Sequence, residues 1–218
     1  HAEYLELMLK VVIPQIMENG LAKRADIFVE EGAFGVNEAR DYAKKLINLG
    51  FNMTMHVDQF HAGGSEMSAE LGCVSADHLE CTNDTSVTAI ANSDTVAVAL
   101  PGASIGLGMQ FTPARKLLDA GASLAIATDW NPGSAPMGDL LTQASILGAS
   151  EKLSIAETLA GITTRAAHAL RVDAGTISIG KPARLSFFET DDFRNIFYQQ
   201  GQLRPVFTVI GSNLFYNE

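Results

Sequence analysis

The feature that most constrains this chain is a regular alternation of short apolar runs with longer segments of helical periodicity. Runs with strand character lie at 26–29, 52–57, 74–77, 95–100 and 123–128. Apolar residues recur at helical spacing in the segments 36–47, 65–71, 84–93 and 113–120, and in 4–16, where Pro14 predicts a kink. Strands alternating with helices predict β-α-β units, and therefore an α/β fold with a parallel sheet.

Two architectures are built on such a sheet. A doubly wound sheet usually carries a Gly-rich phosphate turn after its first strand, and no G-x-G-x-x-G opens a helix after a strand in this sequence. A (β/α)8 barrel instead gathers polar residues at the C-terminal ends of several strands. Polar residues follow three predicted strands, at 56–59, 77–80 and 129–131. We therefore predict that residues 1–174 are part of a TIM-like (β/α)8 barrel, with several strands expected upstream of His1.

The pattern changes after residue 174. Gly and Pro turns separate short strand-like runs at 175–181 and 183–189, and the run 207–210 faces 214–216 across Gly211-Ser212-Asn213 in a predicted hairpin. We predict that residues 175–218 supply strands of a small, composite β-sandwich domain. The Gly-rich stretch 101–109 is predicted to be a long loop that serves as a lid or pocket wall.

Charge and composition limit the partners. The 218 residues hold 15 Lys and Arg against 25 Asp and Glu, a net charge of −10. This balance argues against nucleic acid or an anionic membrane as the main partner, because both attract clustered Lys and Arg. The apolar runs fall far short of the roughly 20 residues of a membrane span. Cys73 and Cys81 form no C-x-x-C, which favours reduced thiols. We expect a cytoplasmic protein with a small-molecule partner.

Three groups suited to a divalent metal follow predicted strands. His56 ends one strand, Asp77-His78 ends the next, and Asp129 ends a later one. Imidazole and carboxylate together suit Zn²⁺ or Fe²⁺. A catalytic zinc site usually has three or more protein ligands, so this set is incomplete, and each residue also has an ordinary structural interpretation.

Two loops have backbone amides suited to an anion. Asn131 and Ser134 flank Gly133 ahead of a helix predicted to begin near Met137, which suits either a carboxylate site or a plain turn. The second loop is Gly63-Gly64-Ser65, interpreted as a helix cap rather than an anion site. His61 is interpreted as a loop residue and His168 as a residue packed on a helix.

Several motifs occur together in a fixed order. They are Val29-Glu30-Glu31-Gly32-Ala33-Phe34, His56-Val57-Asp58-Gln59, Gly63-Gly64-Ser65-Glu66, Ser75-Ala76-Asp77-His78-Leu79-Glu80 and Thr128-Asp129-Trp130-Asn131-Pro132-Gly133-Ser134. In this set and order they resemble the C-terminal portion of the imidazolonepropionase family, within the metal-dependent amidohydrolase superfamily.

This resemblance implies a function and a set of site residues. The reaction would be hydrolysis of the lactam C–N bond of 4-imidazolone-5-propanoate to N-formimidoyl-L-glutamate in histidine degradation. One divalent metal, Zn or Fe, would be held by His56 and Asp129. His78, Asp129 and Gln59 would be catalytic. The substrate would be bound by Gln59, Asn131, Gly133 and Ser134. The resemblance leaves a homodimer open.

Two departures keep other interpretations open. The H-x-H pair of the family's first barrel strand is absent, so two ligands would come from residues outside this sequence. Some relatives carry Glu at the position of Gln59, and an amide is no base, which shifts proton transfer to Asp129 or His78. The alternatives are an amidohydrolase for another cyclic amide or amidine, and a non-catalytic fragment. A metal-free barrel would need a Lys at a strand end, and none occurs.

Overall fold

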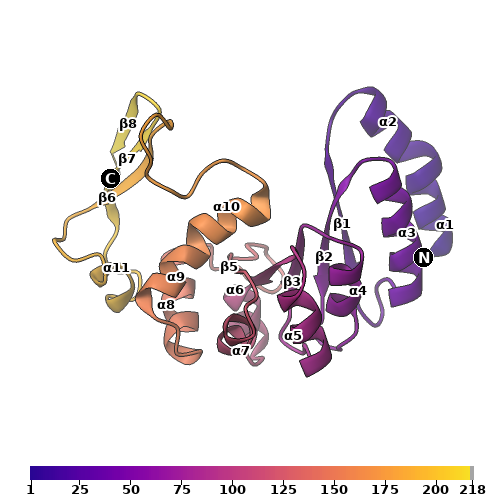
Figure 1. The fold of residues 1–218 in the computed structure, drawn as a ribbon, viewed down its shortest axis with the longest axis horizontal. Helices are drawn as coiled ribbons and strands as arrows, with labels where there is room; N and C mark the ends of the chain where they lie inside the picture. The colour runs from indigo at the N-terminus through magenta and orange to yellow at the C-terminus, as the bar shows by residue number, and fades with distance from the viewer. Residues whose placement is uncertain (217–218) are drawn as a thin grey trace. The chain divides into compact units, whose positions relative to one another are not determined.

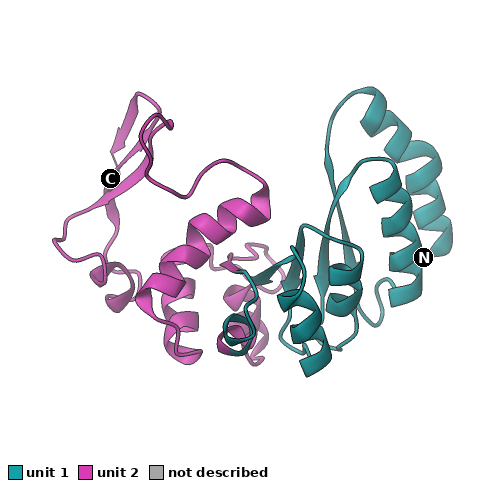
Figure 2. Cartoon of the chain, in the orientation of Figure 1, with its two compact units in different colours: residues 1–98, 116–123 teal, residues 99–115, 124–218 magenta. Residues whose placement is uncertain are grey.

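The computed structural model describes residues 1–216 (Figure 1). The chain divides into two compact units, drawn in different colours in Figure 2. Unit 1 is His1–Val98 with Lys116–Ser123, and unit 2 is Ala99–Arg115 with Leu124–Glu218. The predicted site residues are therefore shared between the units, with His56, Gln59 and His78 in unit 1.

Unit 1 contains the parallel sheet that the sequence predicts. Its strands are β1 (Arg24–Val29), β2 (Asn52–Val57), β3 (Ser75–His78) and β4 (Val96–Ala99), whose last residue belongs to unit 2. They pair in parallel and in chain order, β1 with β2, β2 with β3, and β3 with β4. Parallel neighbours bring their carboxyl ends to one edge, so the residues that follow β1, β2 and β3 belong to the same edge.

The helices of unit 1 fall close to their predicted positions. They are α1 (Ala2–Leu7), the π-helical segment η1 (Met8–Val12), α2 (Ile13–Glu18), α3 (Val36–Asn48), α4 (Gly64–Glu70), α5 (Asp84–Ala91) and α7 (Ala114–Asp119), whose first two residues lie in unit 2. The irregularity predicted at Pro14 is this π-helical segment, which directly precedes α2. Proline removes one backbone donor and crowds the preceding turn, which disturbs the regular helical ladder there.

The two faces of the unit 1 sheet differ in chemistry. Helices α3 and α4 pack against β2, where Met53 and Met55 are fully buried and Ser68 of α4 donates to Met55 Sδ at 3.2 Å. Side chains alternate along a strand, so Thr54 and His56 point to the opposite face. The sheet therefore has an apolar face under its helices and a polar face that carries His56.

Unit 2 combines helices with a second sheet. Its helices are α6 (Pro101–Leu107), α8 (Leu140–Ser150), α9 (Ile155–Ile162), α10 (Thr164–Leu170) and α11 (Asn195–Tyr198). The strands of this second sheet are β6 (Arg184–Phe188), β7 (Pro205–Ile210) and β8 (Asn213–Tyr216), and unit 2 also contains β5 (Leu124–Ile126), which is not part of it. Helix α9 packs on β5, where Gly161 leaves room for the side chain of Ile126.

The predicted hairpin near the C-terminus is confirmed. Strands β6, β7 and β8 form an antiparallel sheet, with β7 and β8 joined by Gly211-Ser212. Phe187 and Phe207 stack with their ring centroids 4.3 Å apart. The register places six apolar residues on one face of this sheet: Leu185, Phe187, Phe207, Val209, Leu214 and Tyr216.

Two local predictions are wrong. The stretch 101–109 is helical over Pro101–Leu107 rather than a loop, with Pro at the first turn and left-handed Gly108 at its end. Its small residues pack without a periodic apolar stripe, so no helical pattern is visible in the sequence. The stretch 175–181 is not a strand, and Ile177 and Ile179 are exposed. An alternating pattern becomes a strand only beside a hydrogen-bonding partner, and this stretch pairs with none among the described residues.

An ion pair in unit 2 predicts acid sensitivity. Nη1 and Nη2 of Arg115 each donate to one carboxylate oxygen of Glu157 at 3.0 Å. This pair, followed by the amide and hydroxyl of Ser154, holds the pKa of Glu157 at about 2. Because the pKa in the folded protein lies below the usual value of 4.5, the stabilisation is present above about pH 4.5 and is lost as the pH falls toward 2.

We therefore expect the free energy of unfolding to fall on acidification from pH 6 to pH 3, and to fall by about 1 kcal/mol less in Glu157→Gln. This free-energy difference is smaller than the shift in the pKa of Glu157 alone would give, because solvent screens a partly exposed ion pair. Urea titrations of both proteins at the two pH values measure the difference. An equal fall in both proteins would contradict the assignment.

Candidate active site

The predicted site residues of unit 1 lie at or just beyond the carboxyl ends of its strands. His56 is the penultimate residue of β2, and its register partner on β3 is Asp77. His56 Nε2 lies 3.6 Å from Asp26 Oδ1 and 4.0 Å from Asp77 Oδ2. The structure therefore brings His56 together with two carboxylates on the polar face of the sheet.

Asp77 carries an unusual buried oxygen. Burial raises the pKa of this carboxyl, against the lowering effects of the Ser75 hydroxyl and the His56 ring. Its Oδ1 is buried and has no hydrogen-bond partner among the described residues. A buried oxygen without a donor is costly, so this edge of the sheet presents an acceptor that is not satisfied within residues 1–216.

His78 lies beside His56. It ends β3 with a left-handed backbone (φ 86°) and is buried. The two imidazole ring centroids are 5.5 Å apart in an edge-to-face arrangement. His78 Nδ1 lies 3.7 Å from Glu80 Oε2, which is also buried. The sequence prediction that His56 and His78 converge is confirmed within unit 1.

Gln59 stands in a loop after β2 that two buried carboxylates hold. The first is Asp58, which is fully buried with a left-handed backbone (φ 54°). Its Oδ1 accepts from the amides of Gly63 at 3.0 Å, Gly64 at 2.7 Å and Ser65 at 3.2 Å, and its Oδ2 accepts from the Ser65 hydroxyl. The amides at the start of α4 are thus occupied by Asp58, which supports the helix-cap interpretation and leaves none of the three for an external anion.

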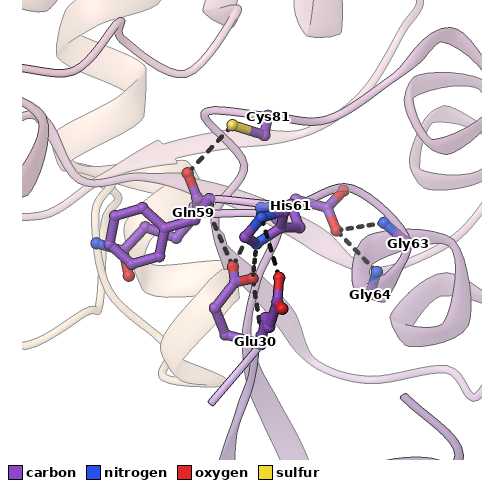
Figure 3. Close-up of polar contacts among 9 residues, drawn as sticks. Glu30, Gln59, His61, Gly63, Gly64 and Cys81 are labelled. Atoms are coloured by element: carbon purple, nitrogen blue, oxygen red, sulfur yellow. Dashed lines mark hydrogen bonds and ion pairs between the residues drawn. The ribbon is translucent and has the colours of Figure 1, made fainter. Parts of the chain in front are cut away.

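The second carboxylate is Glu30, which follows β1. Glu30 accepts from the amides of Glu31, Phe60 and His61 and from His61 Nδ1, the last at 2.7 Å (Figure 3). Burial raises the pKa of Glu30, but these hydrogen bonds together outweigh burial and leave the pKa below its usual value. Glu30 is therefore a stably ionised anchor for the loop.

A third contact holds this loop, and it is made to Gln59 itself. The thiol of Cys81 donates to the carbonyl oxygen of Gln59 at 3.3 Å (Figure 3). Burial, and then the charges of Glu80, Glu30 and Asp58, raise the pKa of this thiol. Cys73 and Cys81 are both free thiols, as predicted.

The remaining predicted residues lie in one loop of unit 2. Asn131 Oδ1 accepts from the amides of Gly133 and Ser134, both at 2.9 Å. Asn131 Nδ2 donates to Asp129 Oδ2 at 3.1 Å, and the Ser134 hydroxyl lies 3.4 Å from the same oxygen. The structure therefore brings Asp129, Asn131, Gly133 and Ser134 together in one hydrogen-bonded turn.

The donor set fits a metal in kind but not in number. Imidazole nitrogens are ligands that Zn²⁺ and Fe²⁺ prefer, and His56 and His78 supply two of them. Among residues 1–216, however, no group of three His, Cys, Asp or Glu side chains is arranged to hold a metal ion. A tightly held metal does not fit the described residues alone, so we assign no reaction step to one.

Comparison with known proteins identifies the family. The sequence matches the amidohydrolase family over residues 12–214. The chain belongs to the amidohydrolase family. Its relatives include the imidazolonepropionases of Deinococcus radiodurans, 39% identical over 92% of this chain and 51% of that protein, and of Bacillus velezensis, 39% identical over 91% and 48%. The chain thus spans about half the length of the curated relatives it matches.

Solved structures support the same fold for this amidohydrolase chain. An adenosine deaminase from Xanthomonas campestris with bound zinc aligns with a TM-score of 0.63 and 20% identity, over 83% of this chain and 48% of that one. An amidohydrolase from a Sargasso Sea sample aligns with a TM-score of 0.71 and 18% identity, over 88% and 48%. At these identities the likeness concerns the fold, and with the parallel sheet it confirms the α/β class.

Two buried carboxylates that hold the Gln59 loop of this amidohydrolase were not predicted from the sequence. Glu30 and Asp58 were read only as parts of motifs, without a role. Their signal was weak, although each directly follows a predicted strand, and Asp58 precedes a Gly-Gly-Ser helix start. Both carboxylates accept hydrogen bonds from one loop. Which amides of that loop face them depends on the register between β1 and β2, and the sequence does not show this register.

Proposed function

We propose that the chain is the C-terminal portion of an imidazolonepropionase. Its reaction is hydrolysis of the lactam C–N bond of 4-imidazolone-5-propanoate to N-formimidoyl-L-glutamate, a step of histidine degradation. The observation that carries the proposal is the cluster of His56, His78 and the anchored Gln59 at one edge of the unit 1 sheet. The 39% identity with two imidazolonepropionases supports it.

In this proposal the residues of unit 1 bind and polarise the ring. Water adds to the ring carbonyl carbon, the C–N bond breaks, and the departing nitrogen takes a proton. His78 donates a hydrogen bond to the carbonyl oxygen as negative charge develops there, and its burial strengthens that interaction. Gln59 binds the substrate through its amide and cannot accept the water proton, so Asp129 or His78 takes it.

The turn in unit 2 holds the propanoate end of the substrate. The amides of Gly133 and Ser134 converge on one acceptor, which is Asn131 Oδ1 in this structure. A substrate carboxylate oxygen can accept from the same two amides. On binding, it therefore replaces Asn131 Oδ1 as their acceptor. Asn131 then donates from Nδ2 to the bound carboxylate.

One divalent metal, Zn or Fe, completes the proposed site, held by His56, Asp129 and ligands outside the described residues. When bound, it supplies Lewis-acid polarisation and lowers the pKa of a water. Zinc is present in the X. campestris adenosine deaminase of similar fold, which supports a divalent metal for this family.

We also propose the larger architecture. Residues 1–174 are part of a (β/α)8 barrel, and residues 175–218 supply strands to a composite β-sandwich. The apolar face of the β6-β7-β8 sheet, with Phe187, Phe207 and Tyr216, supports a second layer packed on it. A structure of the whole protein with this face open to solvent would overturn the sandwich.

The partner of the proposed enzyme is a small molecule. Three further points stay predictions: that neither nucleic acid nor a membrane is a partner, that the protein forms a homodimer, and that it is cytoplasmic. No helix within residues 1–216 is long and apolar enough to cross a membrane.

The test uses the whole protein that carries this chain, and compares His56→Ala with wild type. We expect wild type to hold about one metal per chain and to consume the imidazolone absorbance of the substrate. His56→Ala should lose the metal and at least about 100-fold in turnover. His168→Ala, a matched change on the exposed side of α10, should alter neither.

Three results would redirect the proposal. Wild-type metal content and turnover in His56→Ala would contradict the assigned role of His56. Bound metal without turnover of this substrate would point to another cyclic amide or amidine. Neither metal nor turnover in the wild type would point to a non-catalytic protein.

A further inference from the structure

The loop 58–63 after β2 is held from both sides by buried carboxylates. Asp58 accepts hydrogen bonds from the amides of Gly63 and Gly64 at the C-terminal end of the loop. Glu30 accepts hydrogen bonds from the amides of Phe60 and His61. Burial of a charged carboxylate is costly unless donors surround it, and each of these carboxylates has four. The loop is therefore fixed by strong, charge-assisted hydrogen bonds.

Glu30 directly follows β1, whereas the loop that it contacts follows β2. Its side chain is only 3% exposed, and three of its four donors belong to Phe60 and His61, about thirty positions further along the chain. The His61 ring is 61% exposed, and its Nδ1 lies 2.7 Å from Glu30 Oε1. The carboxylate thus fixes both the backbone and the one imidazole of this loop (Figure 3).

Gln59 stands between the two anchors. Its neighbours in sequence are Asp58 and Phe60, which belong to one anchor each, and its own carbonyl oxygen accepts from Cys81. The Gln59 residue is itself buried. Gln59 is thus held directly at its carbonyl oxygen and indirectly through the residue on either side, so the direction in which its side-chain amide leaves the loop is set before a substrate arrives.

We propose that Glu30 is a positioning residue for Gln59, acting through the hydrogen bonds it accepts from Phe60 and His61. This inference rests on the proposed function, in which Gln59 binds the cyclic amide. The role of Glu30 is to keep the Gln59 amide in one orientation, and so to set which ring substrates are bound.

The geometry does not favour a metal at Glu30 and His61. Nδ1 of His61 faces Glu30 Oε1, whereas Nε2 lies 3.4 Å from Glu31 Oε2. The two carboxylates contact opposite ring nitrogens, so they do not converge on one point. The contact is a hydrogen bond that orients the imidazole.

The first test is Glu30→Gln in the whole protein. An amide keeps the shape of Glu30 but exchanges one acceptor oxygen for a donor, which opposes the amides that face it. We expect KM for 4-imidazolone-5-propanoate to rise about 10-fold while kcat changes less than about 3-fold, because a binding group is misplaced. Glu31→Gln is the matched control. Its side chain is 81% exposed, and KM should stay within about 2-fold of wild type.

A double-mutant cycle with Gln59→Ala separates positioning from general structural damage. If Glu30 acts through Gln59, Glu30→Gln should change KM less than about 2-fold once Gln59 is alanine. A full 10-fold rise in that background would overturn the proposal. So would wild-type KM in Glu30→Gln itself.

Amide hydrogen exchange gives a readout that needs no substrate. Exchange at Phe60 and His61 should speed up at least about 10-fold in Glu30→Gln and stay unchanged in Glu31→Gln. If the wild type turns over no substrate, the proposed function fails while this result still tests the anchor. Unchanged exchange overturns it. Should Glu30→Gln not fold, His61→Ala removes one of the same hydrogen bonds at an exposed ring, and faster exchange at Phe60 is then the expected result.

Discussion

Asp58→Ala is expected to lower the free energy of unfolding by about 3–5 kcal/mol. The substitution removes the acceptor of three amides and one hydroxyl at the start of α4, at a residue that is fully buried. Each buried donor left without an acceptor costs about 1–3 kcal/mol, reduced where water reaches it. Urea unfolding followed by far-UV circular dichroism measures the loss.

Asp58→Asn is the control for this prediction. The amide retains an oxygen that can accept from Gly63, Gly64 and Ser65, and its nitrogen can donate to the Ser65 hydroxyl. We expect a loss of only about 1 kcal/mol, since the hydrogen bonds survive and the charge does not. Equal losses in both variants would show that charge, rather than donor satisfaction, stabilises this loop.

Gly106→Ala is expected to displace the turn that contains Asn131 and Ser134, although Gly106 lies more than twenty residues earlier in the chain. A β-carbon at Gly106 of α6 would overlap the backbone carbonyl of Ser134, which has no flexible end that could move away. Alanine in a helix ordinarily stabilises it by up to about 1 kcal/mol over glycine. The overlap reverses that sign, and we expect a net loss of about 1–3 kcal/mol.

The same substitution should affect binding under the proposed function. A shift of Ser134 disturbs the two amides that meet at Asn131 Oδ1, so we expect KM to rise at least about 10-fold. Ile105→Ala changes the neighbouring, exposed position of α6 and should leave KM within about 2-fold. Wild-type stability and KM in Gly106→Ala would mean that α6 and the turn do not pack as the structure has them.

The local elements were largely predictable because burial imposes a period. The strand at 52–57 matches β2 (Asn52–Val57), and the helical segment from 36 matches α3 (Val36–Asn48), whose Ala39, Tyr42, Ala43 and Leu46 are buried. Where the buried residues of a helix are small, the helical spacing of large apolar residues is not visible in the sequence. Helix α6 buries Gly102, Ala103 and Ser104, and the sequence therefore predicted a loop there.

The residues of the candidate site were predictable in part for the same reason. A polar residue at the carboxyl end of a buried strand stands out, which is why the sequence predicts His56, His78 and Asp129. The convergence of Asp129 with His56 stays a prediction, because the two residues belong to different units.

The sequence by itself determined the strand and helix order, the polar strand ends and the motifs that mark an amidohydrolase. Only the tertiary structure decided that Glu30 and Asp58 hold the Gln59 loop, and that Asn131 occupies the amides of Gly133 and Ser134. The physical reason is that periodicity reports burial of a residue's own element. Acceptors such as Glu30 are matched to donors about thirty positions away by strand register, which no local pattern encodes.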